Sequence, residues 1–228
     1  MSEKKKVLLI FILFIIIGGA LIAYLMNLQF AKISTKVLGN ETLGSVEKIG
    51  VYGNPNSPVK IAYIVGVHPL ENQTHQAVFE SIKSKDSSLK YAYYIYKVNV
   101  TQDSLDYEKG RMNGQLLASR YTVPDIKKQN FALVVDVHSN VGNYDVDRFL
   151  YIPASGTAAE SLALHITNKL LWLTIYNPPN PTSTKYVTIP LINSGIPAIV
   201  YETYLNQSEK LTIQQADELV AAVDNLKF

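Results

Sequence analysis

The chain contains no cysteine among its 228 residues. Disulfide bonds and thiolate metal sites are therefore excluded, and a transition-metal site would have to be built from histidine, aspartate and glutamate. Histidine is scarce as well, with four residues in the whole chain. Any such site would rest on a few identifiable positions.

Basic blocks are also absent beyond the first few residues. Of the 21 basic and 19 acidic residues, Lys4, Lys5, Lys6 and Glu3 precede a long apolar run, which leaves 18 of each sign in the remainder. A neutral remainder lacks the basic patch that nucleic-acid binding requires, so we expect no nucleic-acid partner. With 47% hydrophobic residues, the chain can bury a sizeable core.

The apolar run, VLLIFILFIIIGGALIAYLM, occupies residues 7–26 and carries no charge. Its 20 residues are about the length that crosses a bilayer as a helix. The lysines before it predict a cytoplasmic N-terminus, with the C-terminal part of the chain extracellular. A cleaved signal peptide is the alternative, but the run is long for one, and no clear A-x-A site follows. We expect a single-pass signal anchor in the cell membrane.

The expected organisation has four parts. Residues 1–6 form a cytoplasmic N-terminus and residues 7–26 the transmembrane signal anchor. Residues 27–45 lack a strong period and are expected to form a stalk, and residues 46–228 a folded domain.

Strand and helix patterns alternate along this folded domain. Apolar, β-branched or aromatic runs predict strands at residues 59–67, 91–100, 131–140, 147–153 and 196–204. Helical spacing predicts helices at residues 70–85, 104–121, 157–176 and 212–226, and the prolines of residues 177–184 predict a loop. The alternation predicts an α/β fold, a three-layer sandwich around a mixed, mostly parallel central sheet.

Polar side chains stand at the carboxyl ends of three of these strands. His68 and Glu71 follow the first, His138 ends another, and Glu202 ends the last. In open α/β sheets the ligand crevice lies outside those ends. Two imidazoles and a carboxylate form a known catalytic zinc set with one position left open for water. A separate glutamate must then accept a proton, and Glu202 is the candidate.

Each of these residues has a structural alternative. His68 and His138 could cap strands by bonding to the backbone, and Glu71 could simply occupy a first helical turn, where acids are favoured. An unpaired carboxylate at a buried strand end is costly, which favours a functional role for Glu202. Asp136 falls on the same strand face as His138. It is either an acceptor that orients the imidazole or a buried, hydrogen-bonded aspartate.

The ordered set of H-x-x-E, D-x-H-S and an isolated strand-end glutamate resembles the zinc carboxypeptidase superfamily, including its succinylglutamate desuccinylase and aspartoacylase branch. The resemblance spans roughly residues 59–204. It implies a zinc metallohydrolase, a carboxypeptidase-like peptidase or amidase. It also implies one zinc ion per chain, held by His68, Glu71 and His138, with Glu202 as the general base.

The resemblance further implies residues that contact the substrate. Relatives place arginines and asparagines between the second and third zinc ligands, where this chain has Arg111 and Asn113. Arg111 would steady the oxyanion, although a solvated helix-surface arginine is the alternative. Tyr186 could close over the substrate, as tyrosines do in relatives, and Lys185 could pair with an acidic substrate group. The adjacent asparagine–arginine pair that holds a terminal carboxylate in the family is missing here, so exopeptidase specificity does not follow.

These inferences together predict a membrane-anchored, extracytoplasmic zinc-dependent amide hydrolase, a metallopeptidase acting on envelope or cell-wall peptides. The substrate follows from the location rather than from any pocket residue. One alternative is a deacylase of small N-acyl amino acids, although enzymes of that branch generally act inside cells. The other is a surface binding module that keeps the fold without turnover, an alternative that an intact Glu202 disfavours.

Overall fold

The computed structural model describes the chain except residues 1–2, 30–32, 155–157, 180 and 182. The chain divides into two units, Met1–Ile33 and Ser34–Phe228. The first contains the helix α1 (Glu3–Gln29). Within it, Glu3–Ile22 is long and apolar enough to cross a membrane, although a signal sequence has the same length and composition. The predicted anchor therefore remains a prediction.

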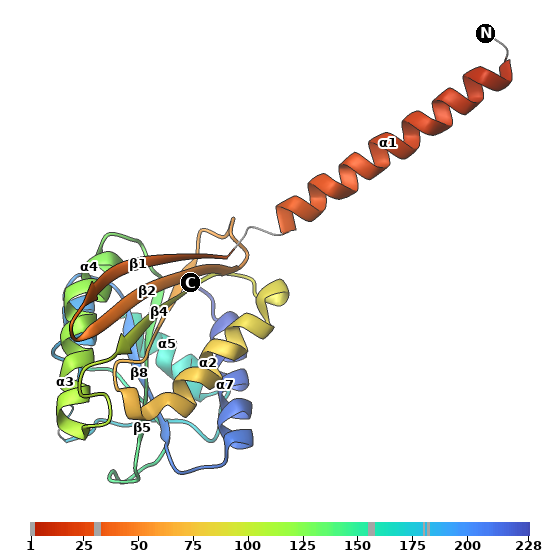
Figure 1. The fold of residues 1–228 in the computed structure, drawn as a ribbon. Helices are drawn as coiled ribbons and strands as arrows, with labels where there is room; N and C mark the ends of the chain where they lie inside the picture. Colours follow the sequence, from red (N-terminus) through yellow and green to blue (C-terminus); the bar gives the residue numbers. More distant parts are fainter. Residues whose placement is uncertain (1–2, 30–32, 155–157, 180, 182) are drawn as a thin grey trace. The chain divides into compact units, whose positions relative to one another are not determined.

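The second unit is built around one eight-stranded sheet (Figure 1). Its strands are β1 (Ser34–Glu41), β2 (Gly44–Gly53), β3 (Lys60–Val65), β4 (Ala92–Val100), β5 (Leu133–Asn140), β6 (Phe149–Tyr151), β7 (Thr174–Ile175) and β8 (Ala198–Tyr204). Their order across the sheet is β1-β2-β4-β3-β5-β8-β6-β7. The central strands β4, β3, β5 and β8 run parallel, and antiparallel pairs join β1, β2 and β6 to them. The mixed, mostly parallel sheet is therefore confirmed.

Helices cover both faces of this sheet. One face carries α2 (Asn72–Ser84), α5 (Ala158–Thr167) and α7 (Glu209–Asp224), and the other carries α3 (Tyr107–Leu117), α4 (Val123–Lys127) and α6 (Thr188–Ile192). In Figure 1, α2 and α7 lie on the opposite side of the sheet from α3 and α4.

Strand β3 shows why the central strands appear in the sequence as continuous apolar runs. Ile61 and Tyr63 pack toward the first set of helices, and Ala62 and Ile64 toward the second. A strand buried on both faces is a continuous apolar run, because successive side chains point to opposite faces. The three-layer sandwich is therefore confirmed.

The chain changes direction across the sheet at β3. From β3 it passes through α2 to β4 on one side, and then through α3 to β5 on the other side of β3. A ligand crevice forms at such a switch point, outside the carboxyl ends of the strands. His68 follows β3 and His138 lies near the end of β5, so the topology brings both to this crevice.

Two expectations differ from the structure. Residues 34–45, expected in a stalk, form β1 and the start of β2, so the folded unit begins at Ser34 rather than at residue 46. The edge strand β1 is largely exposed, so it lacks the apolar alternation of a half-buried strand. The long helix predicted at residues 157–176 ends at Thr167. Leu170 and Leu173 then enter the core outside any helix.

Gly114 determines how closely α3 approaches the site. A Cβ atom there would lie 1.8 Å from the carbonyl oxygen of Val67, so only glycine permits this packing. Helix α3 runs through Gly114 without interruption. The close approach brings Arg111 and Gln115, one on each side of Gly114 in the chain, to the end of β3.

Candidate metal centre

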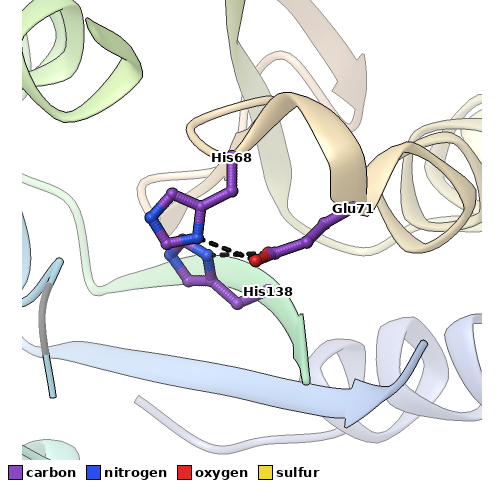
Figure 2. A group of neighbouring side chains, drawn as sticks. All are labelled: His68, Glu71 and His138. Carbon is purple, nitrogen blue, oxygen red and sulfur yellow. Dashed lines mark hydrogen bonds and ion pairs between the residues drawn. The ribbon is translucent and has the colours of Figure 1, made fainter. Parts of the chain in front are cut away.

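Three buried side chains converge near the carboxyl ends of β3 and β5, as Figure 2 shows. His68, Glu71 and His138 each offer one ligand atom, and these atoms lie within 4.8 Å of one another. His68 Nδ1 is 2.9 Å from Glu71 Oε1, and His138 Nδ1 is 3.1 Å from Glu71 Oε2. Both imidazoles therefore present the same ring nitrogen to one carboxylate.

The H-x-x-E motif is a single helical turn at the end of a strand. Its residues Pro69–Glu71 form the short helix η1, with Pro69 at a favourable first-turn position. The Glu71 N–H group donates to the His68 carbonyl oxygen at 3.1 Å. This turn brings the Glu71 carboxylate beside the His68 ring. On the other side, the Ser139 N–H group donates to Glu71 Oε2 at 3.0 Å. Local backbone structure thus holds Glu71 between the two rings.

The far nitrogen of each imidazole also has a neighbour. The Gln115 side-chain amide lies 3.1 Å from His68 Nε2. Asp136 Oδ1 lies 3.1 Å from His138 Nε2, within ion-pair distance but not aligned for a hydrogen bond. An acceptor in such a position, as Asp136 is beside His138, orients a metal-ligating imidazole and raises its basicity. Asp136 is therefore placed for the orienting role. Gln115 was not anticipated, because a glutamine inside a helix forms no recognisable motif.

Burial and neighbouring charges set the protonation of these groups. Burial lowers the pKa of His68 to about 4, against the attraction of Glu71. Burial of the His138 ring opposes its charged form, but Asp136 and Glu71 raise its pKa well above the ordinary value. Burial likewise opposes ionisation of Glu71, yet the two imidazoles hold the pKa of its carboxyl well below the ordinary value. The site therefore holds a buried ionised Glu71 carboxylate beside a neutral His68 ring, and a divalent cation would have to displace the proton of His138 before that ring could serve as a ligand.

Glu202 on β8 stands opposite His138 in the parallel register of β5 and β8. Its Oε2 atom is enclosed and has no hydrogen-bond partner among the described residues. Burial raises the pKa of Glu202 to about 8. The residue lines a cavity of about 230 Å³ together with His68, Glu71 and Arg111. An enclosed carboxyl group with an unused oxygen can exchange a proton with a molecule bound in this cavity.

Arg111 reaches the same cavity from α3. Its Nη1 atom donates to Glu71 Oε1 at 2.7 Å, and its guanidinium lies over the Tyr107 ring, 5.0 Å from the centroid. The side chain is 22% exposed. Arg111 is therefore not the solvated surface arginine that the sequence left as an alternative.

Lys185 and Tyr186 lie further from the candidate ligands. They line a second cavity, of about 410 Å³, which also has Arg111 in its wall. The two cavities share four lining residues, namely Tyr107, Arg111, Asn143 and Tyr144. They therefore adjoin each other, with Arg111 at the boundary.

The structure does not bring Asn113 to either cavity. Its side-chain amide donates to the Gln102 carbonyl oxygen at 2.9 Å, so this asparagine ties α3 to the loop before it. Tyr144, which lines both cavities, was missed. It lies in the loop after β5. The D-x-H-S motif inside β5 does not predict the conformation of that loop.

Neither a protein-family profile nor a curated protein sequence matches the chain. Solved structures do match its fold. A Shewanella amazonensis protein assigned as a metallopeptidase aligns with a TM-score of 0.55 at 11% identity, over 89% of this chain and 91% of that one. The metallo-carboxypeptidase of Pseudomonas aeruginosa, solved with (2-guanidinoethylmercapto)succinic acid, aligns with a TM-score of 0.59 at 13% identity, over 91% and 67%.

A third match is Csd4, a cell shape determinant of Helicobacter pylori solved with a bound tripeptide. Its TM-score is 0.51 at 10% identity, over 78% of this chain and 54% of Csd4. The chain thus spans about half of Csd4 and two thirds of the Pseudomonas enzyme. These similarities confirm the zinc carboxypeptidase-like fold that the motifs predicted.

Proposed function

We propose that the chain is a zinc-dependent amide hydrolase that cleaves peptides outside the cytoplasm while α1 anchors it in the membrane. The observation that carries this proposal is the convergence of His68, Glu71 and His138, with the enclosed carboxyl group of Glu202 in the same cavity. The fold shared with metallopeptidases supports the same class of reaction.

The residues at the site fit a divalent metal ion. Two Nδ1 atoms and a carboxylate oxygen lie within 4.8 Å of one another, and Gln115 and Asp136 flank the far side of the two rings. Two histidines and a glutamate with an open fourth position form a catalytic zinc set, so zinc is the preferred ion. When bound, such an ion polarises a carbonyl group and lowers the pKa of a water molecule.

The chain's own residues would then move the proton and stabilise charge. Glu202 accepts a proton from the attacking water molecule as the water oxygen bonds to the carbonyl carbon. The C–N bond breaks, and Glu202 returns the proton to the leaving amine. Burial raises the pKa of this carboxyl group, and a cation bound in the same cavity would lower it again toward neutral pH, where the group can take up a proton and return it. Arg111, in the cavity wall, would donate to the carbonyl oxygen as negative charge develops.

An extended substrate suits the two adjoining cavities. The inner cavity, which contains His68, Glu71 and Glu202, is also lined by Leu70, Val141 and Leu205. The outer cavity is lined in part by Lys185 and Tyr186. The inner cavity alone is smaller than most small-molecule sites, so a peptide would continue into the outer one. Lys185 would pair there with an acidic group, and Tyr186 would cover the chain. An anchored, outward-facing hydrolase would meet peptides of the envelope or wall.

Metal content and hydrolysis of the full chain in detergent test this proposal. The parent should hold about one zinc ion per chain by mass spectrometry. His138→Ala should lose most of it, whereas the control His165→Ala changes an exposed residue on α5 and should keep it. Peptides and N-acyl amino acids are assayed side by side, and cleavage of only the acyl amino acids would favour a deacylase. A parent that binds no supplied zinc would overturn the proposal.

A further inference from the structure

We propose that Arg111 is the counter-ion of Glu71 while no metal is bound, and that it gives up this carboxylate when a metal binds and turns toward the substrate. The inference rests on the proposed metal site. It couples occupation of that site to the placement of the arginine that contacts the substrate.

The Glu71 carboxylate is surrounded by four close contacts. Oε1 faces His68 Nδ1 at 2.9 Å and accepts from Arg111 Nη1 at 2.7 Å. Oε2 faces His138 Nδ1 at 3.1 Å and accepts from the Ser139 N–H group at 3.0 Å. Of these four, the Arg111 contact is the shortest and comes from a permanently charged group. Since an unpaired buried carboxylate is costly, Arg111 supplies part of the positive charge that a metal ion would otherwise supply.

Arg111 and a metal ion would compete for Glu71. Ligation requires a Glu71 oxygen that faces the imidazole nitrogens, and Oε1, which faces His68, is also the acceptor of Arg111. A divalent cation among the three ligands would stand close to the guanidinium, and cations repel strongly in an enclosed site of low dielectric. Arg111 therefore weakens metal binding, and metal binding weakens the Arg111–Glu71 pair by the same factor.

The geometry gives Arg111 a second position. Its guanidinium lies over the Tyr107 ring, and Arg111, Tyr107 and Tyr144 all line both cavities. If the guanidinium turned away from Glu71, the Tyr107 ring and the wall that the cavities share would still be beside it. There it can donate to a substrate carbonyl oxygen. Arg111 thus turns toward the substrate only when the metal site is filled.

The unmodified full chain in detergent offers the first test. Arg111, Arg120 and Arg148 are its only arginines, and phenylglyoxal labelling followed by peptide mass spectrometry reports the reaction rate of each. Arg120 forms a more exposed ion pair with Glu41 at 2.8 Å and serves as the internal control. Zinc should raise the labelling rate of Arg111 several-fold and leave that of Arg120 unchanged. An Arg111 rate that zinc leaves unchanged or lowers would overturn the proposal.

The second test measures zinc affinity by competition with a chelator. Arg111→Met removes the charge and keeps most of the stem, so it should bind zinc about tenfold more tightly, which corresponds to about 1.4 kcal/mol. Its metal-free form should melt at a lower temperature than the parent. Arg111→Lys retains a charge and should stay near the parent, and Arg120→Met should change neither quantity. Equal or weaker zinc binding by Arg111→Met would contradict the competition.

Two outcomes separate this inference from the proposed function. If the parent binds no zinc, both fail. If zinc binds and peptides are cleaved, but Arg111 shows neither the labelling nor the affinity effect, only the coupling fails. Should Arg111→Met fail to fold without metal, the labelling of the parent decides.

Discussion

His138 on β5 and Glu202 on β8 stand opposite each other in the register of two adjacent parallel strands. One offers a ligand nitrogen and the other an enclosed carboxyl oxygen. Because backbone hydrogen bonds hold neighbouring strands about 4.8 Å apart, the sheet itself sets the distance between the candidate ligand and the candidate base. Sites built on strands keep their geometry better than sites built on loops.

Glu202→Gln should abolish most of the hydrolysis and leave zinc binding intact. The amide has nearly the same shape as the carboxyl group but cannot take up the proton of the attacking water, so we expect kcat/KM to fall about 10²–10⁴-fold. Rates on cleaved peptides and zinc per chain are measured together. Glu209→Gln, at an exposed position on α7, is the matched control. Full activity in the Glu202 variant would support a binding module with no role for this glutamate.

Asp136→Asn should lower zinc affinity about 10–100-fold, because an orienting carboxylate beside a metal-ligating imidazole raises the basicity of that ring. Asp136 is fully buried and lies 3.1 Å from His138 Nε2. Asp217→Asn removes a carboxylate that accepts from Ser81 away from the site, and it should leave zinc affinity unchanged. Chelator competition measures both variants. An unchanged affinity in Asp136→Asn would make this residue a structural aspartate, the alternative that the sequence left open.

The candidate ligands could be predicted because three central strands are buried on both faces. In β3, β5 and β8 the apolar run ends where the strand reaches the crevice, so the polar residues His68, His138 and Glu202 stand out. Gln115 could not be predicted in this way. It reaches His68 only because α3 packs against Val67, and that packing depends on contacts between distant parts of the chain.

Other errors have the same physical origin. Leu170 and Leu173 continue the helical spacing of α5 in the sequence, but they are packed in the core after the helix has ended at Thr167. Asn113 lies at the spacing that the family resemblance suggested, yet its amide is used by the Gln102 carbonyl oxygen. Tertiary packing determines where a helix ends and which partner a side chain contacts. A local sequence pattern carries no information about that packing.

The N-terminal segment should keep the chain in the membrane. The Glu3–Ile22 stretch has a mean hydropathy of 2.5, so the expressed full chain should stay in the membrane fraction after alkaline carbonate washing and require detergent for release. Deletion of residues 7–26 should move the protein to the soluble fraction. Intact-mass measurement distinguishes an anchor from a signal sequence. A mature chain that lacks these residues would show that the segment is cleaved.

Gly114→Ala should destabilise the fold and alter zinc binding at the site. The new Cβ atom would meet the Val67 carbonyl oxygen at 1.8 Å, and because that oxygen belongs to the backbone, α3 must move away. We expect a loss of about 1–3 kcal/mol in the free energy of unfolding, as for other overpacked positions. Alanine favours helix by up to about 1 kcal/mol over glycine, so the measured loss is what remains after that gain.

The same displacement moves Gln115 and Arg111 away from His68 and Glu71, so zinc affinity should change along with stability. Lys109→Ala, at an exposed position of the same helix, is the control that leaves this backbone contact in place. Denaturant unfolding and chelator competition are run on both variants. If Gly114→Ala were as stable as the parent and bound zinc equally well, α3 would not depend on this contact. The placement of Gln115 and Arg111 would then need another cause.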